Sequence, residues 1–400
     1  MKTGTTYLQQ LMAANRANLR DAGVLFPGQS WSDQSRAARD ALEFSTTDPV
    51  LGPESEGKWE ALVAEMLAHR GGPSIFSMEF LSFADPERAA NIVSSLSEAD
   101  VHVVLTIRDA ARTIPAQWQT NCRNAGRVAW PQFVRGVRHA LDSPDSRRPG
   151  ARIMRRTQDI PRMLEVWTPL VGPKRLHVVT VPQSGADPRL LWERFAEAVR
   201  VDPDACPPGF DYTNPSLGHA STELVRQVNV ALGPKQVRSD YDRVVKSRLA
   251  RDILGARVAQ ESKIVLHRPG RNLAARWNRM VREAVIDSQV RLVGDLDELP
   301  TTVRDPESVP QTISLPRDDE LLDAATTARD GMLRLRARLL YPDASQDPST
   351  QASTEGPTTT DRWSGEVHPV GAAVAEVAAL VRECMGAAHP PHATPVGAER

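Results

Sequence analysis

The first residues of the chain combine groups that bind anions. Lys2-Thr3-Gly4-Thr5-Thr6 places a cation, a glycine and three hydroxyls before a predicted helix with Leu8 and Leu11 on its apolar face. A glycine lets the backbone approach a ligand closely, and the N–H groups at a helix start favour an anion. We therefore expect this turn to cradle a phosphate or a sulfate. The alternative is a flexible terminus that leads into an ordinary capped helix.

Two further polar side chains stand at the ends of segments that read as buried strands. Glu79 follows the run Ser74–Met78, and Arg108 closes the run Val101–Arg108. Ligands of parallel sheets bind beyond the carboxyl ends of the strands, so we expect both side chains to face one cleft. A guanidinium there suits a phosphate, and a carboxylate suits a general base. Both also have structural alternatives: Glu79 could cap a helix, and Arg108 could pair with Asp109.

Histidines offer a competing base. His102 and His177 each stand at the start of a predicted strand, which is the edge away from the expected cleft. We therefore interpret them as packed, hydrogen-bonded side chains.

The sequence predicts neither a metal site nor a disulfide framework. The spacing of four residues near the end fits no standard zinc pattern, so we interpret them as solvated tail residues: His368, Cys384, His389 and His392. The three cysteines, Cys122, Cys206 and Cys384, are far apart and odd in number, which is typical of a reducing compartment.

Strands and helices alternate along the chain. Apolar runs predict strands over 74–78, 101–108, 175–182 and 290–294. Helical spacing predicts helices over 5–20, 33–44, 58–69, 86–97, 113–126, 160–170, 190–200, 221–232 and 318–340. This alternation predicts an α/β fold with a doubly wound parallel sheet flanked by helices.

The composition changes after Tyr341. We expect one α/β domain over 1–340 and a disordered linker and tail over 341–400, where Ser, Thr, Pro, Asp and Gln are frequent. Apolar residues at helical spacing predict a short helix at 369–386 within that tail.

The charge balance excludes a general attraction to nucleic acid or to an anionic membrane, because the net charge at pH 7 is −1. The sequence shows no signal peptide and no run of about 18 apolar residues. We therefore expect a cytoplasmic protein. The oligomeric state is left open.

The anion-binding motifs resemble those of the PAPS-dependent sulfotransferases. Lys2-Thr-Gly-Thr-Thr-Tyr-Leu-Gln9 looks like the family's 5′-phosphosulfate loop, and Val103–Asp109 resembles its 3′-phosphate strand. Leu190–Phe195, Asn214–Gly218 and Val293–Asp297 look like segments of a bacterial branch of the family. The likeness covers roughly residues 2 to 340 and implies a P-loop-like sheet.

This resemblance implies a role for each site residue. Lys2 would neutralise the bridging oxygen, backbone N–H groups from Gly4 to Thr6 would hold the 5′-phosphate, and Arg108 would hold the 3′-phosphate. Glu79 stands where heparan-type members carry a glutamate base. The implied reaction moves a sulfuryl group from PAPS, as co-substrate, to a hydroxyl or amine of a small-molecule or glycan acceptor. No metal is required, because such transfers depend on positioning and charge stabilisation.

Two departures from the family pattern keep other functions open. Met1 replaces the proline that normally precedes the lysine, and the preceding strand is missing, so we expect this chain to be truncated at its N-terminus. Ala116 stands where the family often has a serine for the 3′-phosphate. Asn214 and Ser216 fit either a ligand pocket or a capped turn. The alternative functions are a degenerate, non-catalytic nucleotide-binding or interaction protein and a P-loop kinase, for which Asp109 would be the Mg²⁺ ligand.

Overall fold

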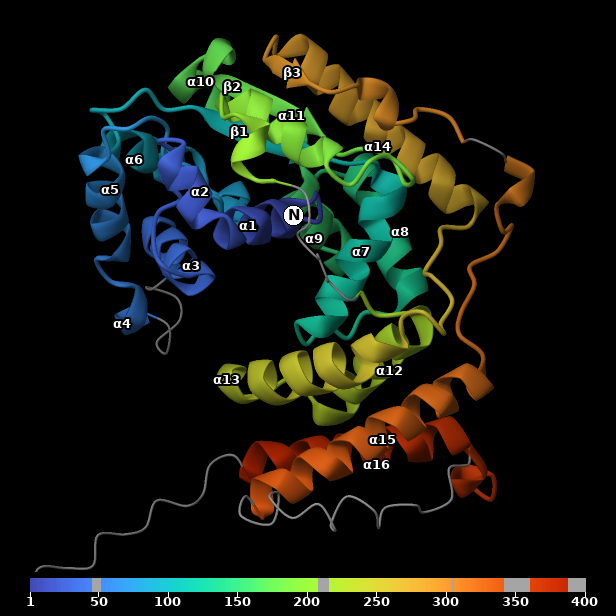
Figure 1. The fold of residues 1–400 in the computed structure, drawn as a ribbon. Helices are drawn as coiled ribbons and strands as arrows, with labels where there is room; N and C mark the ends of the chain where they lie inside the picture. The colour runs from blue at the N-terminus through green and yellow to red at the C-terminus, as the bar shows by residue number, and fades with distance from the viewer. Residues whose placement is uncertain (45–51, 208–215, 304–305, 342–359, 388–400) are drawn as a thin grey trace, which may run out of the picture. The chain divides into compact units, whose positions relative to one another are not determined.

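The computed structural model describes residues 1–44, 52–207, 216–303, 306–341 and 360–387. In these ranges the chain is an α/β protein, mostly helical, with one small parallel sheet (Figure 1). No helix within the described ranges is long and apolar enough to cross a membrane.

The sheet has three parallel strands in the order β1-β2-β3. β1 covers Val103–Ile107, β2 covers Leu176–Thr180 and β3 covers Arg291–Val293, which confirms the strands expected at 101–108, 175–182 and 290–294. Val103 pairs with Leu176, and His177 pairs with Arg291. β2 is buried throughout, as a central strand of β-branched residues should be, whereas most of β1 is only half-buried.

The prediction of a strand at 74–78 is wrong. Ser74 forms a single parallel bridge with Leu25, and the residues up to Met78 continue as extended chain without a ladder. The apolar run is extended as expected, but no described strand lies beside it to complete a ladder. Glu79 then opens the short 3₁₀ helix η2 (Glu79–Phe83).

Contacts divide the chain into two compact units. The first contains 1–117, 134–213 and 266–311, and the second contains 118–133, 214–265 and 312–400. This division differs from the single domain expected over 1–340. The expectation placed a boundary where the composition changes, but a fold can join segments that are far apart in the sequence.

The first unit carries the sheet. Its other elements are α1 (Thr5–Ala14), α2 (Arg16–Asp21), α3 (Trp31–Ala41), α4 (Gly52–Ser55), α5 (Lys58–Ala68), α6 (Pro86–Ser95), α9 (Pro149–Gln158), α10 (Ile160–Val171), η3 (Pro173–Arg175), α11 (Leu190–Val199), η4 (Pro203–Ala205), α14 (Arg268–Asp287), η7 (Leu296–Glu298) and η8 (Pro306–Ser308). Two helices, α7 (Ala110–Arg123) and α8 (Trp130–Asp142), contribute residues to both units. Pro149 starts α9 at a position that a helix tolerates.

The second unit is helical. It contains α12 (His219–Leu232), α13 (Arg238–Tyr241), the π-helix η5 (Asp242–Ile253), η6 (Leu254–Arg257), α15 (Asp318–Leu340), η11 (Thr360–Trp363) and α16 (Pro369–Ala387). α16 packs along α15 and α12 (Figure 1). Of the expected tail, 342–359 and 388–400 lie outside the described residues.

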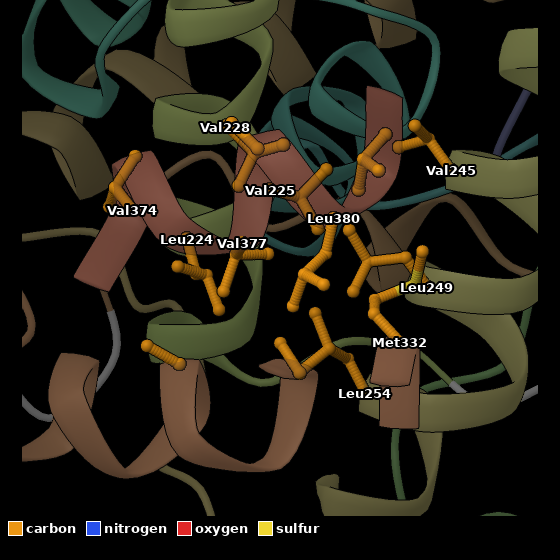
Figure 2. Packing of buried hydrophobic residues seen from close by; sticks show 14 of the residues in the cluster. Leu224, Val225, Val228, Val245, Leu249, Leu254, Met332, Val374, Val377 and Leu380 are labelled. Carbon is orange, nitrogen blue, oxygen red and sulfur yellow. The ribbon is translucent and has the colours of Figure 1, made fainter. Parts of the chain in front are cut away.

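Apolar side chains from α12, α13, η5, η6, α15, η11 and α16 form the core of the second unit. Figure 2 shows Val225 and Val228 of α12, Leu249 of η5, Met332 of α15 and Leu380 of α16 in this cluster. The interpretation of Cys384 as a solvated tail residue is wrong, because α16 buries it completely in the same cluster. Spacing alone showed an apolar face on this segment, and the structure supplies the helices that cover it.

Removing buried volume from α16 tests this packing. Leu380 is 5% exposed, so Leu380→Ala leaves a cavity and should lower the free energy of unfolding by about 2–5 kcal/mol. Leu340→Ala is the matched control, because Leu340 is 52% exposed, and it should change stability by no more than about 0.5 kcal/mol. Equal urea midpoints for both variants would show that α16 does not pack as described.

Candidate active site

The amino-terminal turn leads directly into α1. Lys2 and Gly4 both have positive φ, 62° and 84°, and Gly4 stands at the N-cap of the helix. A Cβ at Gly4 would lie 2.3 Å from Cδ2 of Leu191, so both its backbone conformation and its packing favour glycine. The turn therefore presents the first N–H groups of a ten-residue helix, which is the arrangement expected for an anion site.

Two hydrogen bonds attach this turn to the carboxyl end of β1. The hydroxyls of Thr3 and Thr106 lie 2.7 Å apart, and Thr3 is buried. Nη1 of Arg108 donates to the carbonyl oxygen of Lys2 at 3.2 Å. The two motifs that lie about a hundred residues apart in the sequence therefore meet at one edge of the sheet.

Glu79 reaches the same region through α1. Nε2 of the buried Gln9 donates to Oε2 of Glu79 at 3.1 Å and to the carbonyl oxygen of Ser77 at 2.8 Å. One glutamine, one helical turn after Thr5, thus holds the extended segment 74–79 beside the amino-terminal helix. The structure places Arg108 beside the carbonyl of Lys2, and Gly4, Thr5 and Thr6 follow Lys2 into α1. Glu79 contacts α1 through Gln9.

Asp109 is held as a structural group. Its Oδ1 accepts from Nδ2 of Asn278 at 2.8 Å and from the N–H of Ala111 at 2.9 Å. Oδ1 of Asn278 in turn accepts from the N–H of Ala110 at 2.9 Å. Both Asp109 and Asn278 are buried. This network caps α7 and fixes the backbone that follows Arg108, so that the arginine leaves the sheet at a defined point.

A large cavity lies along β1. Its volume is about 700 Å³, and it runs from Thr3, Thr5 and Glu79 at one end to Asp100 and His102 at the other. Apolar side chains make up most of its wall, including those of Trp59, Ile75, Phe76, Met78, Leu105, Met163 and Trp167.

Sequence reasoning missed three residues at this site. Thr106, Gln9 and Asn278 each supply a contact that positions a predicted residue. Gln9 carried a weak signal, because it lies on the helix that follows the anion turn. Asn278 carried none, since an asparagine in a polar helix gives no hint of a partner 169 residues away.

The two residues suggested for a ligand pocket stay predictions. Asn214 lies outside the described residues, and Ser216 belongs to the second unit. Among the residues that the structure describes, no group of three or more His, Cys, Asp or Glu side chains could hold a metal ion. His389 and His392 lie outside that part of the chain.

The two strand-start histidines pack as expected. Nδ1 of His102 and Nε2 of His177 lie 2.8 Å apart, and Nε2 of His102 lies 3.1 Å from Oδ2 of Asp100. His177 is fully buried, and burial, assisted by His102, Arg291 and Arg200, lowers the pKa of its ring from 6.5 to about 4.

This lowered pKa predicts acid sensitivity. The unfolded chain protonates His177 near pH 6.5, whereas the folded protein keeps it neutral until about pH 4, so stability should fall as the pH drops through this window. Between pH 7 and pH 4.5 the loss from this group is about 2–3 kcal/mol. His177→Gln, which cannot protonate, should therefore show a weaker pH dependence of its urea unfolding free energy by that amount. His139→Gln, at a half-exposed position, is the control and should keep the full dependence. Parallel curves for His177→Gln and the unchanged protein would contradict this account.

Comparisons of this chain with protein-family models, with curated proteins and with solved structures found no match to any of them.

Proposed function

We propose that the chain is a sulfotransferase with a P-loop-like nucleotide site, which uses PAPS as its sulfuryl donor. The observation that carries the proposal is the contact between the side chain of Arg108 and the carbonyl of Lys2, beside the Thr3–Thr106 hydrogen bond. This contact supports one nucleotide site, in which the amino-terminal turn binds one phosphate and Arg108 binds the other.

The residues of the site suit such a donor. The N–H groups that start α1 and the close approach allowed by Gly4 fit a 5′-phosphate, whose negative charge the helix dipole favours. The guanidinium of Arg108 supplies forked donors for a 3′-phosphate. Ala116 lacks the hydroxyl that would assist it, so we assign the 3′-phosphate mainly to Arg108.

Glu79 serves as the base in this proposal. The acceptor oxygen or nitrogen attacks sulfur in line and gives its proton to the Glu79 carboxylate as the new bond forms. The bond between sulfur and the bridging oxygen breaks, and its electron pair leaves on the phosphate oxygen, where Lys2 neutralises the charge. The products are a sulfated acceptor and adenosine 3′,5′-bisphosphate. The protein contributes positioning and electrostatic stabilisation.

A non-catalytic nucleotide-binding protein is the second candidate. The same turn and arginine would bind the bisphosphate, and the extended segment that carries Glu79 is not paired in the sheet, which favours binding over precise chemistry. A P-loop kinase receives less support, because Asp109 is buried and its Oδ1 already accepts from Asn278 and from the start of α7.

The first test separates recognition of the 3′-phosphate from general binding. Arg108→Ala should weaken binding of adenosine 3′,5′-bisphosphate about 10- to 100-fold, as expected for a lost charge-assisted pair, while affinity for adenosine 5′-phosphate changes little. Calorimetric titration with both nucleotides measures the difference. Arg20→Ala, at an exposed position on α2, is the control and should bind both normally. Equal losses for the two nucleotides would place the 3′-phosphate elsewhere.

The second test addresses the chemistry. With labelled PAPS and a panel of hydroxylated and amino acceptors, Glu79→Gln should reduce sulfuryl transfer about 10²- to 10⁴-fold and leave bisphosphate affinity unchanged. Glu87→Gln, on the exposed side of α6, should keep full activity. Tight bisphosphate binding without any transfer by the unchanged chain would favour the non-catalytic protein, and Mg²⁺-dependent phosphate transfer from ATP would favour the kinase.

A further inference from the structure

The sheet has an open edge inside the first unit. β1 pairs with β2 on one side only, and among the described residues no strand pairs with its other side. The 700 Å³ cavity runs along that side, and its wall includes each residue from Val101 to Thr106. An unpaired strand edge normally faces solvent or is covered, because its backbone groups need partners.

The groups that lack a ladder partner can be identified. The carbonyl oxygen of Ile107 accepts from the N–H of Val181, so Ile107 faces the β2 side. Backbone direction alternates along a strand, so Leu105 and Val103 also face β2, whereas Val104 and Thr106 direct their N–H and carbonyl groups toward the cavity.

A second extended segment forms the opposite wall. Residues 74–78 line the cavity and lead to Glu79, which lies beside α1 like the carboxyl end of β1. The two walls therefore run in the same direction. A five-residue strand rises ~3.3 Å per residue, lies ~4.8 Å from its neighbours and spans ~10 Å between layers. The product of these three dimensions is roughly 800 Å³. The cavity volume of about 700 Å³ is therefore close to the volume of one short strand.

We propose that this cavity binds one extended peptide strand, parallel to β1, with apolar side chains on both faces. The strand accepts and donates hydrogen bonds at Val104 and Thr106 and joins β1 to the segment 74–78 in a continuous sheet. Its carboxyl end lies against Met1 and Thr3, which line that end of the cavity. The inference is independent of the sulfotransferase proposal, because it concerns the sheet and not the nucleotide.

The backbone edge favours a peptide over a small apolar molecule. An apolar ligand would fill the volume but would leave the N–H and carbonyl groups of Val104 and Thr106 buried without partners, which is unfavourable. A peptide strand satisfies both residues while its side chains contact the apolar walls.

The test adds a strand to the full chain. The segment Val-Ile-Val-Ile-Val is fused directly ahead of Met1, and amide hydrogen exchange is measured residue by residue. The exchange of Val104 and Thr106 should slow by about tenfold or more, while that of Leu105, already bonded to β2, changes less. The thermal midpoint should rise. The control fusion carries proline at its second and fourth positions, which removes ladder donors and should give neither effect.

Two further experiments test the proposal even if the fusion protein misfolds. The same five residues, supplied as a separate acetylated peptide with solubilising lysines before them, should protect the same two amides in the unmodified chain. Dodecanol serves as a small apolar probe. Protection of Val104 and Thr106 by either peptide form supports the proposal. It is overturned if neither form protects them, or if dodecanol alone stabilises the chain while the peptides do not.

Discussion

The hydrogen bond between Thr3 and Thr106 is the contact on which the candidate site depends. This bond joins the amino-terminal turn to the carboxyl end of β1. The Arg108 side chain adds a second bond, to the carbonyl of Lys2. Without this attachment the anion turn would be only the start of a helix, and a helix start by itself selects no ligand. With it, the backbone of the turn is held beside the Arg108 guanidinium at one edge of the sheet, as preorganised charge stabilisation requires.

The strength of the sequence signals explains what could be predicted. β1 and β2 are rich in β-branched residues, and α1 and α15 have apolar residues at clear helical spacing, so local pattern and final structure agree. The strand-end rule led us to expect Glu79 and Arg108 at one cleft. Lys2 was expected from the residue pattern of the amino-terminal turn, and the structure places its carbonyl beside Arg108.

Other features depend on partners that the sequence does not reveal. Ser74–Met78 has the composition of a strand, yet a strand exists only through its neighbour, and here only Ser74 finds one. Asn278 matters because its amide meets Asp109 across the fold. Cys384 is buried because α12 and α15 cover the apolar face of α16. In each case the deciding interaction is long-range, so no local pattern could have predicted it.

The open edge of β1 also bears on the candidate base. Glu79 is carried by a segment that pairs with Leu25 at its start and is held by Gln9 at its end, with the cavity along its other side. A general base must be positioned to a fraction of an ångström, and the Glu79 carboxylate is held by the hydrogen bond from Gln9. A strand between this segment and β1 would add ladder hydrogen bonds on both sides and set Glu79 at a fixed distance from Arg108. A completed sheet would therefore add to the restraint that Gln9 already gives the Glu79 side chain.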